Sequence, residues 1–175
     1  KAIGECGIDF SYFNHLKGSE NDIINWKQKQ IECFRFQIKL AKKLNLPLIL
    51  HIRNEYKLAL TILEEENFDG QAIFHFFKGN ISEMEEILKN EKYFFGFSGV
   101  ITYDDTMTEV IKMLPMSKIM IETDAPYVSP ISFKREINQP KYVVKVAEKI
   151  AEIKNNSINE ILNATFENAI RFFGI

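Results

Sequence analysis

Short apolar runs alternate with longer amphipathic segments along this chain of 175 residues, and this alternation limits the possible folds more than any other feature. The runs lack a regular polar–apolar alternation, which is typical of strands buried on both faces of a parallel sheet. A segment long enough for a crossover helix separates each run from the next. The predicted strands are residues 2–6 (AIGEC), 46–51 (LPLILH), 71–77 (QAIFHFF), 93–99 (YFFGFSG) and 118–124 (KIMIETD).

The segments between and after these runs carry helical signals. Phe34 and Ile38 have the spacing of one helix face. Ser82 lies three residues before Glu85, which is the spacing of a capping box at a helix N-terminus, and Ser157 begins the same pattern. The predicted helices are residues 28–45, 57–66, 82–90, 105–114, 140–154 and 157–173.

A β–α pattern repeated five times predicts an α/β fold with a parallel sheet, either doubly wound or part of a (β/α)8 barrel. Neither a glycine-rich dinucleotide fingerprint nor a phosphate loop follows any predicted strand. With 46% hydrophobic residues, residues 1–175 can bury one substantial core, so we expect a single domain. The formal net charge of −2 gives no sign of a general affinity for nucleic acid or membranes, so an anionic substrate would need a local basic patch.

The sequence also bears on where the protein works. Cys6 and Cys33 are too few for a disulfide framework. We find no signal peptide and no apolar run long enough to span a bilayer, so we expect a cytoplasmic protein. An apolar strand follows Lys1 almost at once, which is an abrupt start for a natural domain, and we therefore expect these residues to belong to a longer polypeptide.

Residues that can bind metal ions occur near the ends of four predicted strands. Glu5 ends the first strand, His51 ends the second, His75 lies near the end of the third, and Asp124 lies at the end of the fifth. In parallel α/β folds, ligands bind beyond the carboxyl ends of the strands, because side chains there converge. We therefore predict that these four side chains lie within about 8 Å of a common point, as a shared metal cluster requires.

Each of these residues has another interpretation when it is taken singly. A single histidine at a strand end is more often a hydrogen-bonded residue than a metal ligand. Glu5 could pair with Arg53, and Asp124 could cap a helix ahead of Pro126. The third histidine, His15, lies in the polar segment FNHLKG, and we predict a surface position for it. It is the conjunction of two histidines and two acids at strand ends that favours a metal site.

Two imidazoles and two carboxylates suit Zn²⁺, Mn²⁺, Fe²⁺ or Co²⁺, whereas Mg²⁺ would need waters to complete its octahedron. Such an ion lowers the pKa of a bound water and stabilises charge on a phosphoryl or acyl oxygen. Basic residues near the same strand ends could hold an anionic substrate. Arg53 is the strongest candidate for a phosphate because its guanidinium is planar. Lys78, Lys134 and Arg135 are further candidates, although an ordinary solvated position is the more common interpretation of such lysines.

Five segments carry more extended motifs: AIGECGIDF (2–10), LPLILHIR (46–53), IFHFFKG (73–79), IETDAPYVSP (121–130) and NATFENAIRFFGI (163–175). In content and order they resemble the TatD-like metal-dependent hydrolases, a family described chiefly as deoxyribonucleases. The resemblance implies a TIM-like barrel that hydrolyses the phosphodiester bonds of DNA with two divalent metal ions, Mg²⁺, Zn²⁺ or Mn²⁺. It implies metal binding by Glu5, His51, His75 and Asp124, and roles in catalysis for Asp124 and Glu5.

The sequence departs from the family pattern in two places. Family members usually begin with a strand bearing an H-x-H or H-x-D pair, followed by two further β/α units. The resemblance therefore implies that residues 1–175 hold only the last five units of an eight-unit barrel. A later loop reads Ile137, Asn138, Gln139 and Pro140 where the family tends to carry Arg-Asn-Glu-Pro, and Arg135 could replace the lost arginine as a substrate contact.

Two other functions stay open from the sequence. Another amidohydrolase-like barrel could cleave an ester, an amide or a lactone with the same metal chemistry. A truncated barrel that lacks the first-strand histidines could instead be a non-catalytic binding module. If the five units stand alone, the open edges of the sheet predict that the chain associates and does not cleave DNA.

Overall fold

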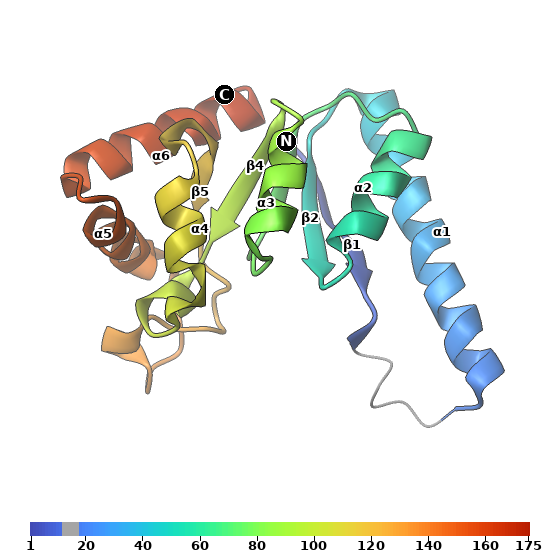
Figure 1. The fold of residues 1–175 in the computed structure, drawn as a ribbon, viewed down its shortest axis with the longest axis horizontal. Coiled ribbons are helices and arrows are strands. Elements are labelled where there is room, and N and C mark those ends of the chain that lie inside the picture. The colour runs from blue at the N-terminus through green and yellow to red at the C-terminus, as the bar shows by residue number, and fades with distance from the viewer. Residues whose placement is uncertain (12–17) are drawn as a thin grey trace.

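The computed structural model describes residues 1–11 and 18–175, and it confirms the α/β class (Figure 1). Five parallel strands form one sheet, in which their spatial order follows their order along the chain. Within the described residues the sheet is open, since its first and last strands each pair with only one neighbour. The strands are β1 (Ile3–Asp9), β2 (Leu48–Arg53), β3 (Ala72–His75), β4 (Tyr93–Phe97) and β5 (Ile119–Ile121).

Helices connect the strands and follow the last one, as the sequence predicts (Figure 1). No helix in the described part of the chain is both long enough and apolar enough to cross a membrane. Short 3₁₀ helices η2 (Gly99–Thr102), η3 (Asp105–Met107), η4 (Met116–Lys118), η5 (Ile131–Phe133) and η6 (Pro140–Tyr142) lie in the connections around and after β5 and α4. The α-helices are α1 (Glu20–Leu44), α2 (Tyr56–Glu65), α3 (Ile81–Leu88), α4 (Thr108–Met113), α5 (Val143–Lys154) and α6 (Ile158–Phe173).

Capping boxes begin both α3 and α6, but only one was predicted at the right residue. At α6 the Ser157 hydroxyl accepts from the backbone N–H of Glu160, whose carboxylate accepts from Ser157 in return, so that prediction is confirmed. At α3 the prediction of a box at Ser82 is wrong. Asn80 and Glu83, two residues earlier, form it instead. Both pairs have the required spacing, and asparagine is as good an N-cap as serine.

The two faces of the sheet have different neighbours. One face packs against the helices that connect the strands. The side chains buried there include Leu50, Phe74 and Phe95, together with Phe34 of α1. The opposite face forms a smaller apolar cluster, in which Phe172 of α6 covers residues of β3, β4 and β5 (Ile73, Phe94 and Met120). Side chains alternate along a strand, so residues two positions after this smaller cluster share its face and lie nearer the carboxyl ends.

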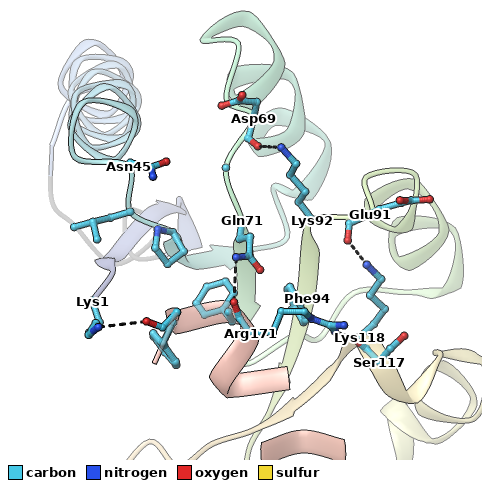
Figure 2. A pocket seen from close by; sticks show the side chains of 16 residues that line it. Lys1, Asn45, Asp69, Gln71, Glu91, Lys92, Phe94, Ser117, Lys118 and Arg171 are labelled. Carbon is cyan, nitrogen blue, oxygen red and sulfur yellow. Dashed lines mark hydrogen bonds between the residues drawn. The ribbon is translucent and has the colours of Figure 1, made fainter. Parts of the chain in front are cut away.

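A cavity of about 1010 Å³ lies at the amino ends of the strands, and its basic groups contact backbone carbonyls (Figure 2). The Nζ atom of Lys1 donates to the carbonyl oxygen of Gly174 over 3.5 Å. Lys92 and Lys118 likewise donate to carbonyl oxygens of the loops before β3 and β4. These contacts hold the loops together at the end of the sheet opposite the two histidines of β2 and β3, so we assign them a structural role.

Candidate metal centre

Strand pairing brings the two predicted histidines together. His51 of β2 lies directly opposite His75 of β3, and the centroids of the two rings are 5.8 Å apart. His75 is almost completely buried, whereas the side chain of His51 is 38% exposed. The parallel register therefore places two imidazoles side by side on the face that carries the smaller apolar cluster. The predicted surface position of His15 lies outside the described residues.

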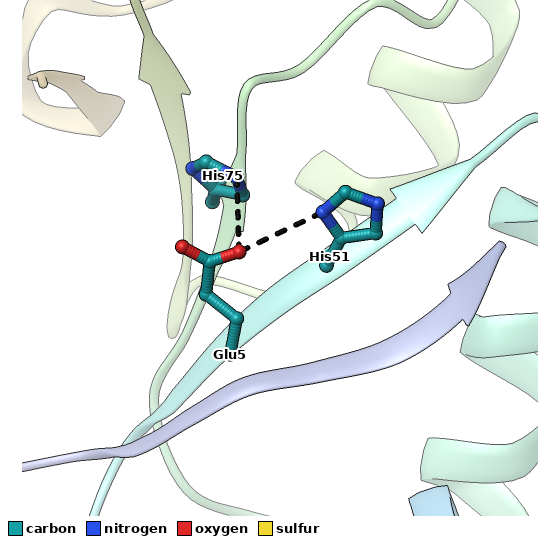
Figure 3. A group of neighbouring side chains, drawn as sticks. All are labelled: Glu5, His51 and His75. Carbon is teal, nitrogen blue, oxygen red and sulfur yellow. Dashed lines mark ion pairs between the residues drawn. The ribbon is translucent and has the colours of Figure 1, made fainter. Parts of the chain in front are cut away.

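Glu5 lies between the two histidines (Figure 3). Its Oε2 atom is 3.7 Å from Nδ1 of His51 and 3.4 Å from Nε2 of His75. The prediction that Glu5 ends its strand is wrong, because β1 continues to Asp9 and its pairing with β2 is irregular near Glu5. The alternative pairing of Glu5 with Arg53 is not observed among the described residues, since Nη1 of Arg53 lies 3.4 Å from Oδ2 of Asp9 instead.

Asp124 lies on the other side of His75. Its Oδ1 atom is 3.8 Å from Nδ1 of His75, so the four predicted residues form one continuous group. The alternative in which Asp124 caps a helix is wrong, because residues 125–126 form a turn, in which the backbone carbonyl oxygen of Asp124 accepts the backbone N–H of Tyr127. Asp124 follows β5 by three residues, which gives it the reach to approach β3 from the edge of the sheet.

The donor atoms of this group fit a divalent metal ion. One ligand atom from each of Glu5, His51 and His75 lies within 4.8 Å of the other two, and the same holds for His75, Glu122 and Asp124. An ion bound at about 2.0–2.3 Å from each ligand requires donor atoms at such separations. One carboxylate and two imidazoles suit borderline ions such as Zn²⁺ or Mn²⁺.

Two carboxylates of this site were not among the four predicted metal ligands. Asp9 Oδ2 lies 3.5 Å from Nε2 of His51, and Glu122 Oε1 lies 3.0 Å from Nδ1 of His75. Each histidine thus has one nitrogen toward Glu5 and the other toward a second acid. The period-two spacing of Glu5 and Asp9 along β1 was a usable signal for Asp9, whereas the contact of Glu122 depends on strands that are distant in sequence.

The charges of the site shift the pKa values of its members. Burial disfavours the charged form of His75, but the hydrogen bond to Glu122 and the nearby carboxylates outweigh it and raise the pKa. Burial also raises the pKa of Asp124, helped by repulsion from Glu122 and Glu5 and opposed by the histidines. Burial by itself would also raise the pKa of Asp9, but hydrogen bonds from Ser11 and the charge of Arg53 outweigh it and lower the pKa.

Of the four candidate substrate contacts, two line a cavity beside the histidines, and Lys134 and Arg135 lie in a later turn. Arg53 and Lys78 contribute to a cavity of about 400 Å³ that also includes His51 and His75. Lys78 donates to Asp104 over 3.0 Å, so its ammonium is held near the mouth of this cavity. Arg135 is exposed after η5.

The comparisons with known proteins agree with this geometry. Residues 1–174 match the family described as "TatD related DNase". The chain belongs to this family. Over 177 aligned residues it is 40% identical to "Uncharacterized metal-dependent hydrolase YabD" of Bacillus subtilis, an alignment that covers 99% of this chain and 65% of that protein. Mouse "Putative deoxyribonuclease TATDN3" is 33% identical over 98% of this chain and 55% of its own length.

The solved structure of the TatD homologue YJJV from Escherichia coli K12 has the same fold, with a TM-score of 0.84 and 28% identity over 99% of this chain. The alignment covers 64% of that structure. This TatD-family chain thus spans just under two thirds of the length of several relatives that it matches.

In this TatD-family site, a metal ion would supply an activated water and positive charge for a developing oxyanion. Glu5, His51 and His75 are the residues placed to hold it, since their donor atoms face one another. Asp124 lies beside His75 with a half-buried carboxylate, where it can accept a proton. The arrangement therefore places potential metal ligands beside a further carboxylate.

Proposed function

We propose that this chain carries part of the active site of a metal-dependent phosphodiesterase, with DNA as the substrate. The observation that carries the proposal is the convergence of Glu5, His51 and His75, with Asp124 beside them, in a chain of the TatD-related DNase family. A metal-activated water attacking phosphorus is the reaction class that this donor set supports.

The roles of the residues follow from their positions. Asp124 orients and deprotonates the attacking water, and Glu5 holds the metal ion between the two histidines. Arg53, in the adjacent cavity, provides a planar guanidinium for a phosphate oxygen. Lys78 and Arg135 are further phosphate contacts.

The proposal extends to the rest of the site. The metal is Mg²⁺, Zn²⁺ or Mn²⁺, and the complete protein binds two ions. The five β/α units form part of an eight-stranded barrel, in which histidines of another strand complete the second metal position. The protein acts in the cytoplasm.

The test is hydrolysis of DNA and of ester and lactone substrates by the natural gene product, with and without added divalent metal. We expect metal-dependent cleavage of DNA, which His75→Ala abolishes together with tightly bound metal. His15→Ala is the matched control and should change neither. Cleavage of an ester or lactone but not of DNA would favour another amidohydrolase-like hydrolase. Metal binding without any hydrolysis would favour a binding module.

A further inference from the structure

The carboxylate of Glu122 reaches across β4 to the ring of His75. Glu122 follows β5 directly, and β4 lies between β5 and the strand that carries His75. Glu122 Oε1 is 3.0 Å from Nδ1 of His75 and also accepts the backbone N–H of Phe76 over 2.6 Å. The backbone N–H of Phe76 therefore holds the carboxylate at the end of β3, within hydrogen-bond distance of Nδ1 of His75.

Gly96 of β4 leaves the space through which this carboxylate passes. A Cβ atom at residue 96 would lie 2.8 Å from Oε2 and 2.9 Å from Cδ of Glu122, closer than real Cβ contacts occur. Gly96 pairs with Met120 of β5, so its missing side chain would lie on the same face as Glu122. Glycine at residue 96 thus allows the Glu122 carboxylate to approach closely. It is not needed for the backbone conformation, because Gly96 does not have a positive φ.

The two nitrogens of His75 face different partners. Nδ1 faces Glu122, whereas Nε2 faces Glu5 at 3.4 Å and the side of the group that includes His51. A neutral imidazole carries one proton, and a metal binds the nitrogen that lacks it. A carboxylate that accepts from one nitrogen therefore decides which nitrogen is left for the metal.

We propose that Glu122 is a positioning residue that keeps the proton of His75 on Nδ1 and presents Nε2 to the metal position beside Glu5. Glu122 acts through His75, because the backbone N–H of Phe76 holds its Oε1 atom at the end of β3, where it faces Nδ1 of His75. The inference rests on the proposed metal site, but the position of the proton can be read in the metal-free protein without any activity.

The competing role for Glu122 is direct metal binding together with His75 and Asp124, whose donor atoms are also close. In that arrangement His75 would have to bind through Nδ1, the nitrogen that faces these two acids. His75 cannot donate Nδ1–H to Glu122 and bind metal through Nδ1 at the same time. The two roles thus predict different protonated nitrogens.

The experiment combines ¹⁵N NMR of the imidazoles in the metal-free protein, at a pH where His75 is neutral, with titrations of Mn²⁺ and Zn²⁺. We expect the wild type to show Nδ1–H at His75. Glu122→Ala should lose this preference and weaken metal binding about 10- to 100-fold, as removal of such partners does at other metal sites. Glu122→Gln keeps an amide oxygen that can accept both N–H groups and should restore the tautomer and most of the affinity.

Two further variants sharpen the test. Gly96→Ala crowds the carboxylate without removing it and should weaken metal binding in the same direction as Glu122→Ala. Glu86→Ala, an exposed acid of α3 that pairs with Lys89, is the matched control and should leave both readouts unchanged.

Two results would overturn the inference: an unchanged Nδ1–H signal and metal affinity in Glu122→Ala, or Nε2–H at His75 of the wild type together with an equal loss of metal in Glu122→Gln and Glu122→Ala. The second result would make Glu122 a direct ligand. If Glu122→Ala does not fold, the spectra of Glu122→Gln and Gly96→Ala decide between the same alternatives. If the wild-type protein shows the Nδ1–H signal and binds metal but does not hydrolyse DNA, the proposed function is contradicted and this inference stands.

Discussion

Asn138 secures the segment that follows Asp124. Its buried amide donates to the carbonyl oxygens of Tyr127 and Val128 over 2.6 and 3.2 Å. Asn138→Ala leaves these carbonyls without that donor, so we expect the free energy of unfolding to fall by roughly 1–3 kcal/mol. Urea denaturation measures the effect, and exposed Gln139→Ala should change stability by less than about 0.5 kcal/mol.

The carboxylate of Asp104 gives a prediction about pH. Hydrogen bonds from the side chain and backbone of Thr106, and then from Lys78, lower the pKa of Asp104 from 3.8 to about 2. A lowered pKa in the folded state stabilises the fold above pH 3.8, and this stabilisation disappears as the pH falls toward 2. Because solvent screens this partly exposed group, we expect Asp104→Asn to cost about 1 kcal/mol at pH 7. Denaturation at pH 7 and pH 3 should show the cost shrinking at the lower pH, and a cost that grows on acidification would contradict the assignment.

At the scale of elements, one buried amide joins α6 to the start of β5. Asn168 donates to the carbonyl oxygens of Met116 and Ile119, each over 2.8 Å. We expect Asn168→Ala to lower the unfolding free energy by about 2 kcal/mol, since both carbonyls lose a buried partner. Asn163→Ala on the exposed side of the same helix is the matched control. It should be neutral or slightly stabilising because alanine has the higher helix propensity. Equal changes in melting temperature for Asn168→Ala and Asn163→Ala would show that the two hydrogen bonds of Asn168 do not stabilise the fold.

The sequence predicted the elements well because their apolar periodicity reflects burial. His51 and His75 could be placed because each lies at or near the carboxyl end of its strand, although β2 continues past His51 to Arg53. The end of β1 was missed, since AIGEC alone gave no sign that pairing continues to Asp9. The role of Glu122 could not be predicted either. It depends on the register of three strands and on the space above Gly96, neither of which a local pattern records.

At the scale of the whole molecule, the edge of β1 and the adjacent face of α1 are exposed. Ile3, Cys33 and Phe36 line a groove of about 700 Å³ there, and Phe36 is 67% exposed. Within the described residues β1 pairs with β2 alone, and a strand with one free edge beside an apolar groove is a template for association. We therefore predict that the 175-residue chain expressed by itself self-associates, and that Phe36→Lys reduces this. Size-exclusion chromatography with light scattering measures both, and a monomer at high micromolar concentration would contradict the prediction.

Above all, we infer that Glu5, His51 and His75 bind one divalent metal ion. Anomalous diffraction from crystals grown with Mn²⁺ or Zn²⁺ is the most direct test, because it locates the ion and its ligand atoms. We predict an anomalous peak within bonding distance of the Glu5 carboxylate, of Nδ1 of His51 and of Nε2 of His75. Anomalous density only at other positions at saturating metal, or binding of His75 through Nδ1, would contradict it.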